Sequence, residues 1–226
     1  MKEINTNKGL YRYEEKDITK EKYIFNKEIS KLLLLEILEL FKAIDIDIIL
    51  IYGTLLGAIR EKDLIEHDDD VDLIIPEHKK DIFINALHEF RTNGYELIRN
   101  EGNLFSLEKD GQYIDIYIFI AMNNVLGDKY WLCNNLRISH EILNKTIDYE
   151  LFGKTFKIPE NWEQYLIEEY GSDWRTPKIN YRNDGYNKRY YMLRKYVPNK
   201  IYNYITSKPH LKAYLKNLFY SLIYKK

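Results

Sequence analysis

Cysteine is nearly absent from the sequence: Cys133 is the single example among 226 residues. One cysteine excludes an intramolecular disulfide and favours a reducing compartment, so we expect a cytoplasmic protein. Long apolar runs are absent too. No segment reaches the roughly 18 uninterrupted apolar residues needed to span a bilayer, and the first residues contain no signal-peptide core. We therefore expect neither secretion nor a transmembrane anchor.

The sequence also lacks an excess of either charge. It has 34 Lys and Arg against 35 Asp and Glu, for a formal net charge of -1. This balance argues against a nucleic-acid-binding protein that relies on a basic surface, so any binding of phosphate must be local. The length suits one domain with elaborations.

Helical and extended patterns alternate along the chain. Apolar spacing predicts a helix that Ser30 caps and that runs to about Ala43. The β-branched run at residues 46–53 predicts a strand, and the helical spacing after it places Gly53 and Thr54 at a strand-to-helix turn. Four further strands are expected at "DVDLIIP", "YELIR", "LFSLE" and "YIDIYIF", and two further helices at "EHKKDIFINALHEFRTNG" and "NWEQYLIEEYG".

The acidic stretch "DDDVDL" stands at the start of one expected strand. Side chains alternate faces along a strand, so Asp70 and Asp72 point the same way while Val71 and Leu73 point into the core. Carboxylates this close repel each other and are normally tolerated where a cation neutralises them. Asp115 is the one carboxylate in the apolar strand "YIDIYIF" and is a candidate third ligand.

Each of these features taken alone has a plainer interpretation. The four aspartates are compatible with a solvated loop, and Asp115 with an exposed sheet face. An EF-hand is excluded, because Leu73 stands where glycine is required and Lys79 where glutamate is required. His67 could either ligate a metal or cap the loop, and we prefer the second interpretation. Arg60 faces either a phosphate or the acidic residues around it.

The order of the motifs resembles the nucleotidyltransferase fold and, within it, the LicD family, which includes fukutin and its relatives. "YGTLLGAIR", a loop and then "DDDVDL" resemble that family's signature, "YIDIYIF" is similar to its third-carboxylate strand, and "YLIEEYGSDWRTP" resembles a later element. The resemblance covers about residues 33–177. It departs from the family at Glu66 and His67, which stand where an aromatic residue is common, so the donor or acceptor contacts usually made there are in question.

The resemblance implies an α+β, nucleotidyltransferase-like fold with a mixed β-sheet that carries the carboxylates and with flanking helices. We divide the chain into an N-terminal segment (1–29), a catalytic domain (30–180) and a basic, aromatic C-terminal extension (181–226). We expect an amphipathic helix in this extension, at about residues 209–224. Either its leucine face is expected to dock on the domain or on a second subunit, or the helix is expected to form a peripheral contact with the inner face of an anionic membrane.

The resemblance also implies an activity. Family members transfer a substituted phosphate, phosphocholine in the best-known case, from a CDP-linked donor to a sugar hydroxyl of a cell-surface glycan such as teichoic acid, lipopolysaccharide or capsule, with release of CMP. On this basis the partners are a CDP-alcohol and a glycan or lipid-linked glycan, and no nucleic acid. The alternatives are a nucleotidyltransferase that attaches a nucleotide to its target, a metal-dependent glycosyltransferase, and a non-catalytic member of the family.

The residues of the motifs suit this chemistry. Asp70, Asp72 and Asp115 are expected to hold Mg²⁺ or Mn²⁺, because hard oxygen ligands favour these ions over zinc. Asp115 is also a candidate to accept the proton of the sugar hydroxyl. Donor phosphate is expected to bind at the backbone of Gly53, at the hydroxyl group of Thr54 and at the free N–H groups of the helix that follows. Arg60 is a further candidate to bind it.

Overall fold

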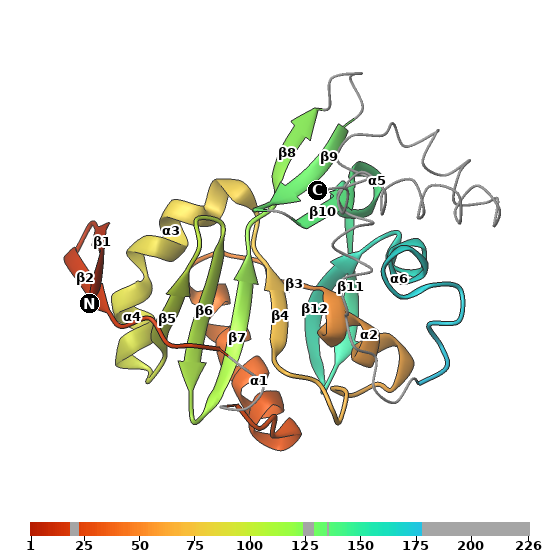
Figure 1. Cartoon of the computed structure of the whole chain (residues 1–226), viewed down its shortest axis with the longest axis horizontal. Coiled ribbons are helices and arrows are strands. Elements are labelled where there is room, and N and C mark those ends of the chain that lie inside the picture. Colours follow the sequence, from red (N-terminus) through yellow and green to blue (C-terminus); the bar gives the residue numbers. More distant parts are fainter. Residues whose placement is uncertain (19–22, 124–128, 135, 178–226) are drawn as a thin grey trace, which may run out of the picture.

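The computed structural model describes residues 1–18, 23–123, 129–134 and 136–177 (Figure 1). One mixed sheet of seven strands forms its centre, in the order β11-β12-β3-β4-β7-β6-β5. The α+β fold expected from the sequence is confirmed. The strands of this sheet are β3 (Ile49–Leu50), β4 (Val71–Ile74), β5 (Glu96–Asn100), β6 (Leu104–Lys109), β7 (Gln112–Tyr117), β11 (Thr146–Leu151) and β12 (Lys154–Pro159).

Both parallel and antiparallel pairs occur in the sheet. β4 is antiparallel to β3 and parallel to β7, while β7, β6 and β5 form an antiparallel meander. At the other edge β12 is parallel to β3 and forms a hairpin with β11. The short strand β3 therefore joins the two halves of the sheet, and the acidic strand β4 lies at its centre (Figure 1).

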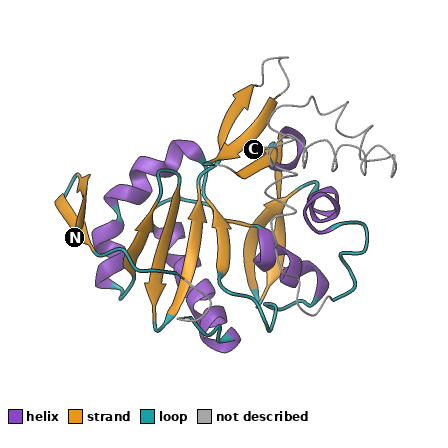
Figure 2. Ribbon diagram, viewed as in Figure 1, coloured by secondary structure: helices purple, strands orange, loops and turns teal. Residues whose placement is uncertain are grey.

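Helices flank this sheet (Figure 2). Rings from three helices and one strand pack against each other: Phe41 contacts Phe83 and Phe90, and Phe83 contacts Phe105 of β6. The apolar core therefore lies between one sheet face and these helices, which leaves the opposite face of β4 and β7 for polar groups. The helices are α1 (Lys27–Ala43), α2 (Tyr52–Arg60), the 3-10 helix η1 (Glu77–Lys79), α3 (Lys80–Asn85), α4 (Leu87–Thr92), α5 (His140–Leu143) and α6 (Trp162–Tyr170).

Two smaller sheets extend this core. The hairpin of β1 (Lys2–Thr6) and β2 (Gly9–Tyr13) lies beside α3 and α4, where Asn7 N–H donates to Asn85 Oδ1 at 2.7 Å (Figure 1). A three-stranded sheet of β8 (Ile120–Asn123), β9 (Lys129–Cys133) and β10 (Leu136–Ser139) follows β7. None of the described helices is long and apolar enough to cross a membrane.

The structure corrects two expected boundaries. The cap of α1 is Asn26, whose side chain accepts a hydrogen bond from Ile29 N–H at 3.1 Å, and the helix begins before Ser30. Ser30 is buried in the first turn, and its hydroxyl group donates to Gln112 Oε1 at 3.2 Å. The expected helix after Pro76 begins with the 3-10 turn η1, and a break at Ala86 separates the following α3 from α4.

The strand expected at residues 46–53 is also shorter than predicted. Only Ile49 and Leu50 pair in the sheet, Ile51 is the cap of α2, and Tyr52 turns the chain with a φ of +44°. Gly53 and Thr54 consequently lie inside the first turn of α2. The extension 181–226, with the amphipathic helix expected there, lies outside the described residues.

Candidate active site

Asp72 and Asp115 lie directly opposite each other in the parallel strands β4 and β7. Paired residues of adjacent strands project from the same face of a sheet, so the two carboxylates lie side by side. Both are buried, with 6% and 3% of their surface exposed. The interpretation of Asp115 as a solvated residue on an exposed sheet face is therefore wrong.

Asp70, immediately before β4, completes the cluster. One carboxylate oxygen from each of Asp70, Asp72 and Asp115 lies within 4.8 Å of the others. Three converging carboxylates at this spacing are a ligand set for a hard divalent cation. The structure thus brings together the three aspartates that the sequence indicated as candidate ligands.

Two further side chains, which the sequence did not indicate, hold Asp115. Ser106 of β6 donates its hydroxyl group to Asp115 Oδ1 at 2.6 Å. Arg99 of β5 donates from Nη2 to Asp115 Oδ2 and from Nε to Ser106 Oγ, the latter at 2.8 Å. Asp115 is consequently the one member of the cluster with an ion-pair partner of its own among the described residues.

Tyr117 connects Asp72 and Asp115. Its hydroxyl oxygen lies 3.1 Å from Asp72 Oδ1 and 3.3 Å from Asp115 Oδ2. A phenol has one proton, so it can donate to one of the two carboxylates at a time. The ring contacts that of Tyr52, at 5.2 Å between centroids, so the aromatic packing fixes the position of this hydroxyl group.

The start of α2 lies against the cluster. Gly53 N–H donates to Asp72 Oδ2 at 3.2 Å, and Asp72 N–H donates to Thr54 Oγ1 at 2.8 Å. These reciprocal contacts place the positive end of the α2 dipole beside the carboxylates. Thr54 is 1% exposed, so its hydroxyl oxygen serves first to position β4.

Asp68 lies over the backbone of Gly53. A Cβ atom added at Gly53 would come within 2.2 Å of Asp68 Oδ2. Glycine at this position therefore lets an acidic side chain approach the helix start closely. A second close approach follows in the same helix, where a Cβ at Gly57 would meet the carbonyl oxygen of Asp63 at 2.6 Å.

Burial and mutual repulsion act on the cluster together. Burial, followed by the charges of neighbouring aspartates, raises the pKa of Asp70 and Asp72 well above the usual range. Burial also raises the pKa of Asp115, although Arg99 opposes that rise. The same burial and the nearby carboxylates raise the pKa of Tyr117, so its hydroxyl group stays protonated.

Arg60 lies at the opposite end of α2 from Gly53. Its Nε and Nη2 donate to Glu61 Oε1, and its Nη1 donates to the carbonyl oxygen of Trp174 at 3.3 Å. The structure therefore does not bring Arg60 together with the other predicted site residues. His67 is exposed in the loop before the cluster.

The residues fit a divalent cation. Three carboxylates carry three negative charges, and one guanidinium, that of Arg99, contacts them. A cation with two positive charges would neutralise the remaining charge and relieve the repulsion that raises the carboxylate pKa values. Such a site can bind the phosphate oxygens of a nucleotide through the shared cation.

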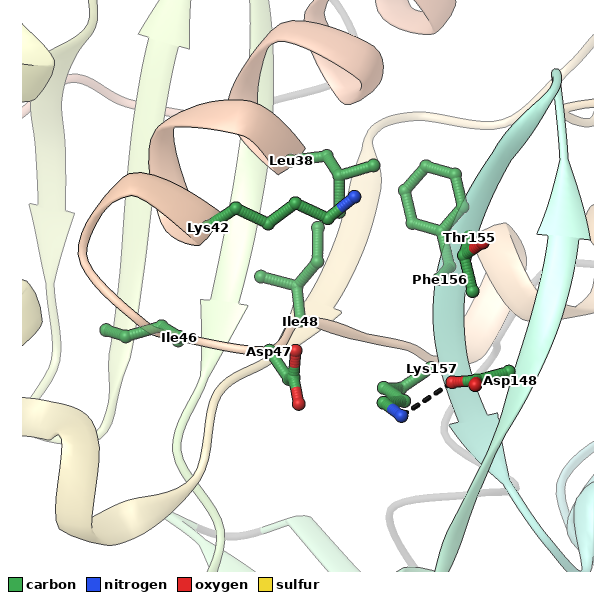
Figure 3. A pocket seen from close by; sticks show the side chains of 9 residues that line it. All are labelled: Leu38, Lys42, Ile46, Asp47, Ile48, Asp148, Thr155, Phe156 and Lys157. Atoms are coloured by element: carbon green, nitrogen blue, oxygen red, sulfur yellow. Dashed lines mark hydrogen bonds and ion pairs between the residues drawn. The ribbon is translucent and has the colours of Figure 1, made fainter.

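A separate cavity of about 190 Å³ lies between α1 and the β3–β12 junction. Figure 3 shows Lys42 pointing into it, opposite the ion pair of Lys157 and Asp148, whose charged atoms are 2.5 Å apart. Leu38 and Phe156 are among its apolar lining residues. The cavity shares no lining residue with the carboxylate cluster.

Solved structures with some similarity to this chain include several nucleotidyltransferases. The lincosamide antibiotic adenylyltransferase LnuA has a TM-score of 0.45 and 16% identity, with 65% of this chain and 89% of that chain covered. The antibiotic-resistance factor ANT(2'')-Ia has a TM-score of 0.47 and 12% identity, with 87% of this chain and 96% of that chain covered. An antigenic nucleotidyltransferase-like protein from Paracoccidioides brasiliensis has a TM-score of 0.41 and 15% identity, with 85% of this chain and 88% of that chain covered.

No curated protein sequence matches the chain at a significant level. A family match does exist: residues 45–161 match the family described as LicD/FKTN/FKRP, nucleotidyltransferase domain. That range extends from the residues before β3 to the start of α6, so it contains the whole carboxylate cluster. Because the match spans more than half of the chain, the protein belongs to the LicD family.

Proposed function

We propose that the protein transfers a substituted phosphate, with phosphocholine as the first candidate, from a CDP-linked donor to a sugar hydroxyl of a cell-surface glycan, releasing CMP. Family membership establishes the broader class, a transferase of the phosphotransferase or nucleotidyltransferase type. The single observation that carries the proposal is the convergence of Asp70, Asp72 and Asp115 within 4.8 Å beside the start of α2. Phosphoryl transfer depends mainly on such charge neutralisation and positioning.

In this proposal the three carboxylates hold Mg²⁺ or Mn²⁺. A cation bound there supplies a positive charge that the oxygens of the donor pyrophosphate can share. Gly53 and Thr54 hold Asp72 through the contacts at 3.2 and 2.8 Å, so that its carboxylate stays aimed at the cluster. The dipole of α2 adds partial positive charge where the phosphate oxygens would lie.

Asp115 is better suited to hold the cation than to accept the proton of the sugar hydroxyl. Its two oxygens already accept hydrogen bonds from Ser106 and Arg99, and the Tyr117 hydroxyl group that it shares with Asp72 lies 3.3 Å from Oδ2. A carboxylate has about four acceptor positions, so about one remains open whenever Tyr117 donates to Asp115. We assign that position to the cation and leave the acceptance of the proton to a group outside this network.

The decisive experiment follows CMP release from a panel of CDP-alcohols (choline, ethanolamine, glycerol and ribitol) with Mg²⁺, in the presence and absence of a glycan acceptor. The proposal expects acceptor-dependent CMP release that Asp72→Asn abolishes. Pyrophosphate release from a nucleoside triphosphate would instead identify a nucleotidyltransferase, and consumption of a UDP- or GDP-sugar a glycosyltransferase. Either result would replace the proposal.

A further inference from the structure

We infer that Arg99 is a positioning residue that, together with Ser106, fixes the Asp115 carboxylate so that one of its oxygens faces the cation. The inference rests on the cation site of the proposed function and does not depend on which donor is used. Arg99 lies on β5, two strands away from β7, and nothing in the motifs of the sequence indicates it. Its contacts to Ser106 and Asp115 carry the argument.

The residues involved form one row across four neighbouring strands. Asp72 of β4 is paired with Asp115 of β7, Asp115 with Ser106 of β6, and Ser106 with Arg99 of β5. Paired residues share a sheet face, so all four side chains project on the face of the carboxylate cluster. The row therefore connects a partly exposed guanidinium to the buried acidic site.

A shift in strand register places Arg99 in this row. Between Leu97 and Arg99 the pairing of β5 with β6 slips by one residue. Leu97 is paired with Leu107, so regular pairing would set Ile98 opposite Ser106, whereas the irregularity sets Arg99 there. Such bulges re-aim side chains and are common next to active sites. An apolar side chain in this place could donate nothing to Ser106 or Asp115.

The contacts leave Asp115 one orientation. Oδ1 accepts from Ser106 at 2.6 Å, while Oδ2 accepts from Arg99 and lies 3.3 Å from the Tyr117 hydroxyl. When Tyr117 donates to Asp115, both positions on Oδ2 are taken, and in either case one position on Oδ1 is open. Ser106 is itself held by Arg99 Nε at 2.8 Å, so the guanidinium orients both oxygens of the carboxylate.

The charge of Arg99 has a second consequence. The three carboxylates and Arg99 carry a formal charge of -2 together, which one divalent cation balances. Removing the guanidinium charge would leave the site more negative and would attract cations more strongly, which opposes the effect of a lost orientation. A charge-preserving variant separates the two effects, because Lys keeps the positive charge but lacks the planar fork that holds Ser106 and Asp115 together.

The test measures binding of Mn²⁺ to the metal-free, full-length protein by calorimetry for wild type, Arg99→Lys and Ser106→Ala. Arg91→Lys is the matched control, because Arg91 forms a comparable forked contact with Glu96 that does not involve the cluster. We expect Arg99→Lys and Ser106→Ala to weaken Mn²⁺ binding about tenfold to a hundredfold, the usual effect of losing a group that orients a metal ligand. Arg91→Lys should bind Mn²⁺ as wild type does.

A purely structural role for Arg99 would give a different pattern. The melting temperature of the metal-free protein would then fall in Arg99→Lys while the affinity for Mn²⁺ stayed at the wild-type value, and that result would overturn the inference. Absence of Mn²⁺ binding to the wild-type protein would overturn it as well. Mn²⁺ binding that depends on Arg99, combined with no turnover of any CDP-alcohol, would support this inference while removing the proposed donor.

Discussion

Asp72 and Asp115 are paired residues in adjacent parallel strands, and the Tyr117 hydroxyl group lies between their carboxylates. The backbone pairing of β4 and β7 forces this approach, so neither side chain can move far without leaving the cluster. With Asp70 close by, the metal-free protein holds a repulsive, buried arrangement of acids. Function and stability therefore make opposite demands on the same three residues, and this can be measured.

The first prediction concerns the loss of each carboxylate. Asp70→Asn, Asp72→Asn and Asp115→Asn should each reduce transfer by more than about 100-fold, because losing a ligand should exceed the effect of losing a group that only orients one. Circular dichroism should show an unchanged fold. Near wild-type kcat in Asp72→Asn would contradict the assignment of the site.

The second prediction concerns pH and the stability of the metal-free protein. The pKa of Asp72 is raised in the folded state, mainly by burial, so above the ordinary aspartate pKa the unfolded chain releases a proton that the folded chain retains. Folding stability is therefore lost as pH rises from the ordinary pKa towards the raised one. Asp72→Asn should melt like wild type near about pH 4 and at least about 3 °C higher near about pH 7.

Differential scanning calorimetry of both proteins across this pH range tests the prediction. Asp45→Asn is a suitable control, because its partner Lys79 lowers the pKa of this exposed acid and its removal should not stabilise the protein at neutral pH. Saturating Mg²⁺ should raise the melting temperature of wild type more than that of Asp72→Asn. A temperature difference between wild type and Asp72→Asn that does not change with pH would show that repulsion in the cluster is not the cause.

The third prediction separates two reasons for glycine at position 53. In Gly53→Ala the new Cβ atom would meet the Asp68 carboxylate, so Asp68 must move away from the start of α2. We expect donor affinity to fall at least about tenfold, because under the proposed function the Cβ would also occupy space used by the donor phosphate. The double variant Gly53→Ala/Asp68→Ala removes the contact with Asp68. The melting temperature of the double variant should be higher than that of Gly53→Ala, whereas its donor Kd, measured by calorimetry, should stay weakened. Recovery of both properties would assign the whole effect to Asp68.

Much of the fold and three residues of the site could be predicted because they depend on local pattern. Alternation along "DVDL" placed Asp70 and Asp72 on one face, and Asp115 was a candidate third ligand as the one carboxylate of "YIDIYIF". The structure places one carboxylate oxygen of each within 4.8 Å of the others. The sequence "KDGQ" is typical of a hairpin turn, and it joins β6 to β7 with Asp110 and Gly111 both at positive φ. These features need no knowledge of distant parts of the chain.

The residues that were missed depend on long-range register. Arg99 reaches Asp115 through a one-residue slip between β5 and β6, and no local pattern shows where a strand slips. Ser106 looked like an ordinary strand residue until its partner was known. Ser30 is a residue type that often caps helices, but Asn26 caps this helix instead. The Ser30 hydroxyl group donates a hydrogen bond to Gln112, far along the chain. In each case a contact between residues distant in the sequence determined the role of the side chain, and the local sequence was compatible with more than one role.

The last prediction concerns Arg60, for which the sequence left phosphate binding and pairing with acids equally open. Its side chain is 13% exposed and joins Glu61 to the carbonyl oxygen of Trp174, at the end of α2 remote from Gly53. Arg60→Ala should therefore lower the unfolding free energy by about 1–2 kcal/mol, since it leaves polar partners unpaired. Donor Kd should stay within about twofold of wild type, because no contact to the cluster is lost.

Arg175→Ala is the matched control for that variant, because Arg175 also packs on Trp174 but pairs with Glu163 at an exposed site, with its side chain 61% exposed. Surface pairs of this kind contribute little, so its melting temperature should stay close to that of wild type. Thermal melts and calorimetric titrations of both variants with CDP-choline give the comparison. A large loss of donor affinity in Arg60→Ala with an unchanged melting temperature would instead show that Arg60 reaches the phosphate, which would require α2 or the segment after α6 to rearrange when the donor binds.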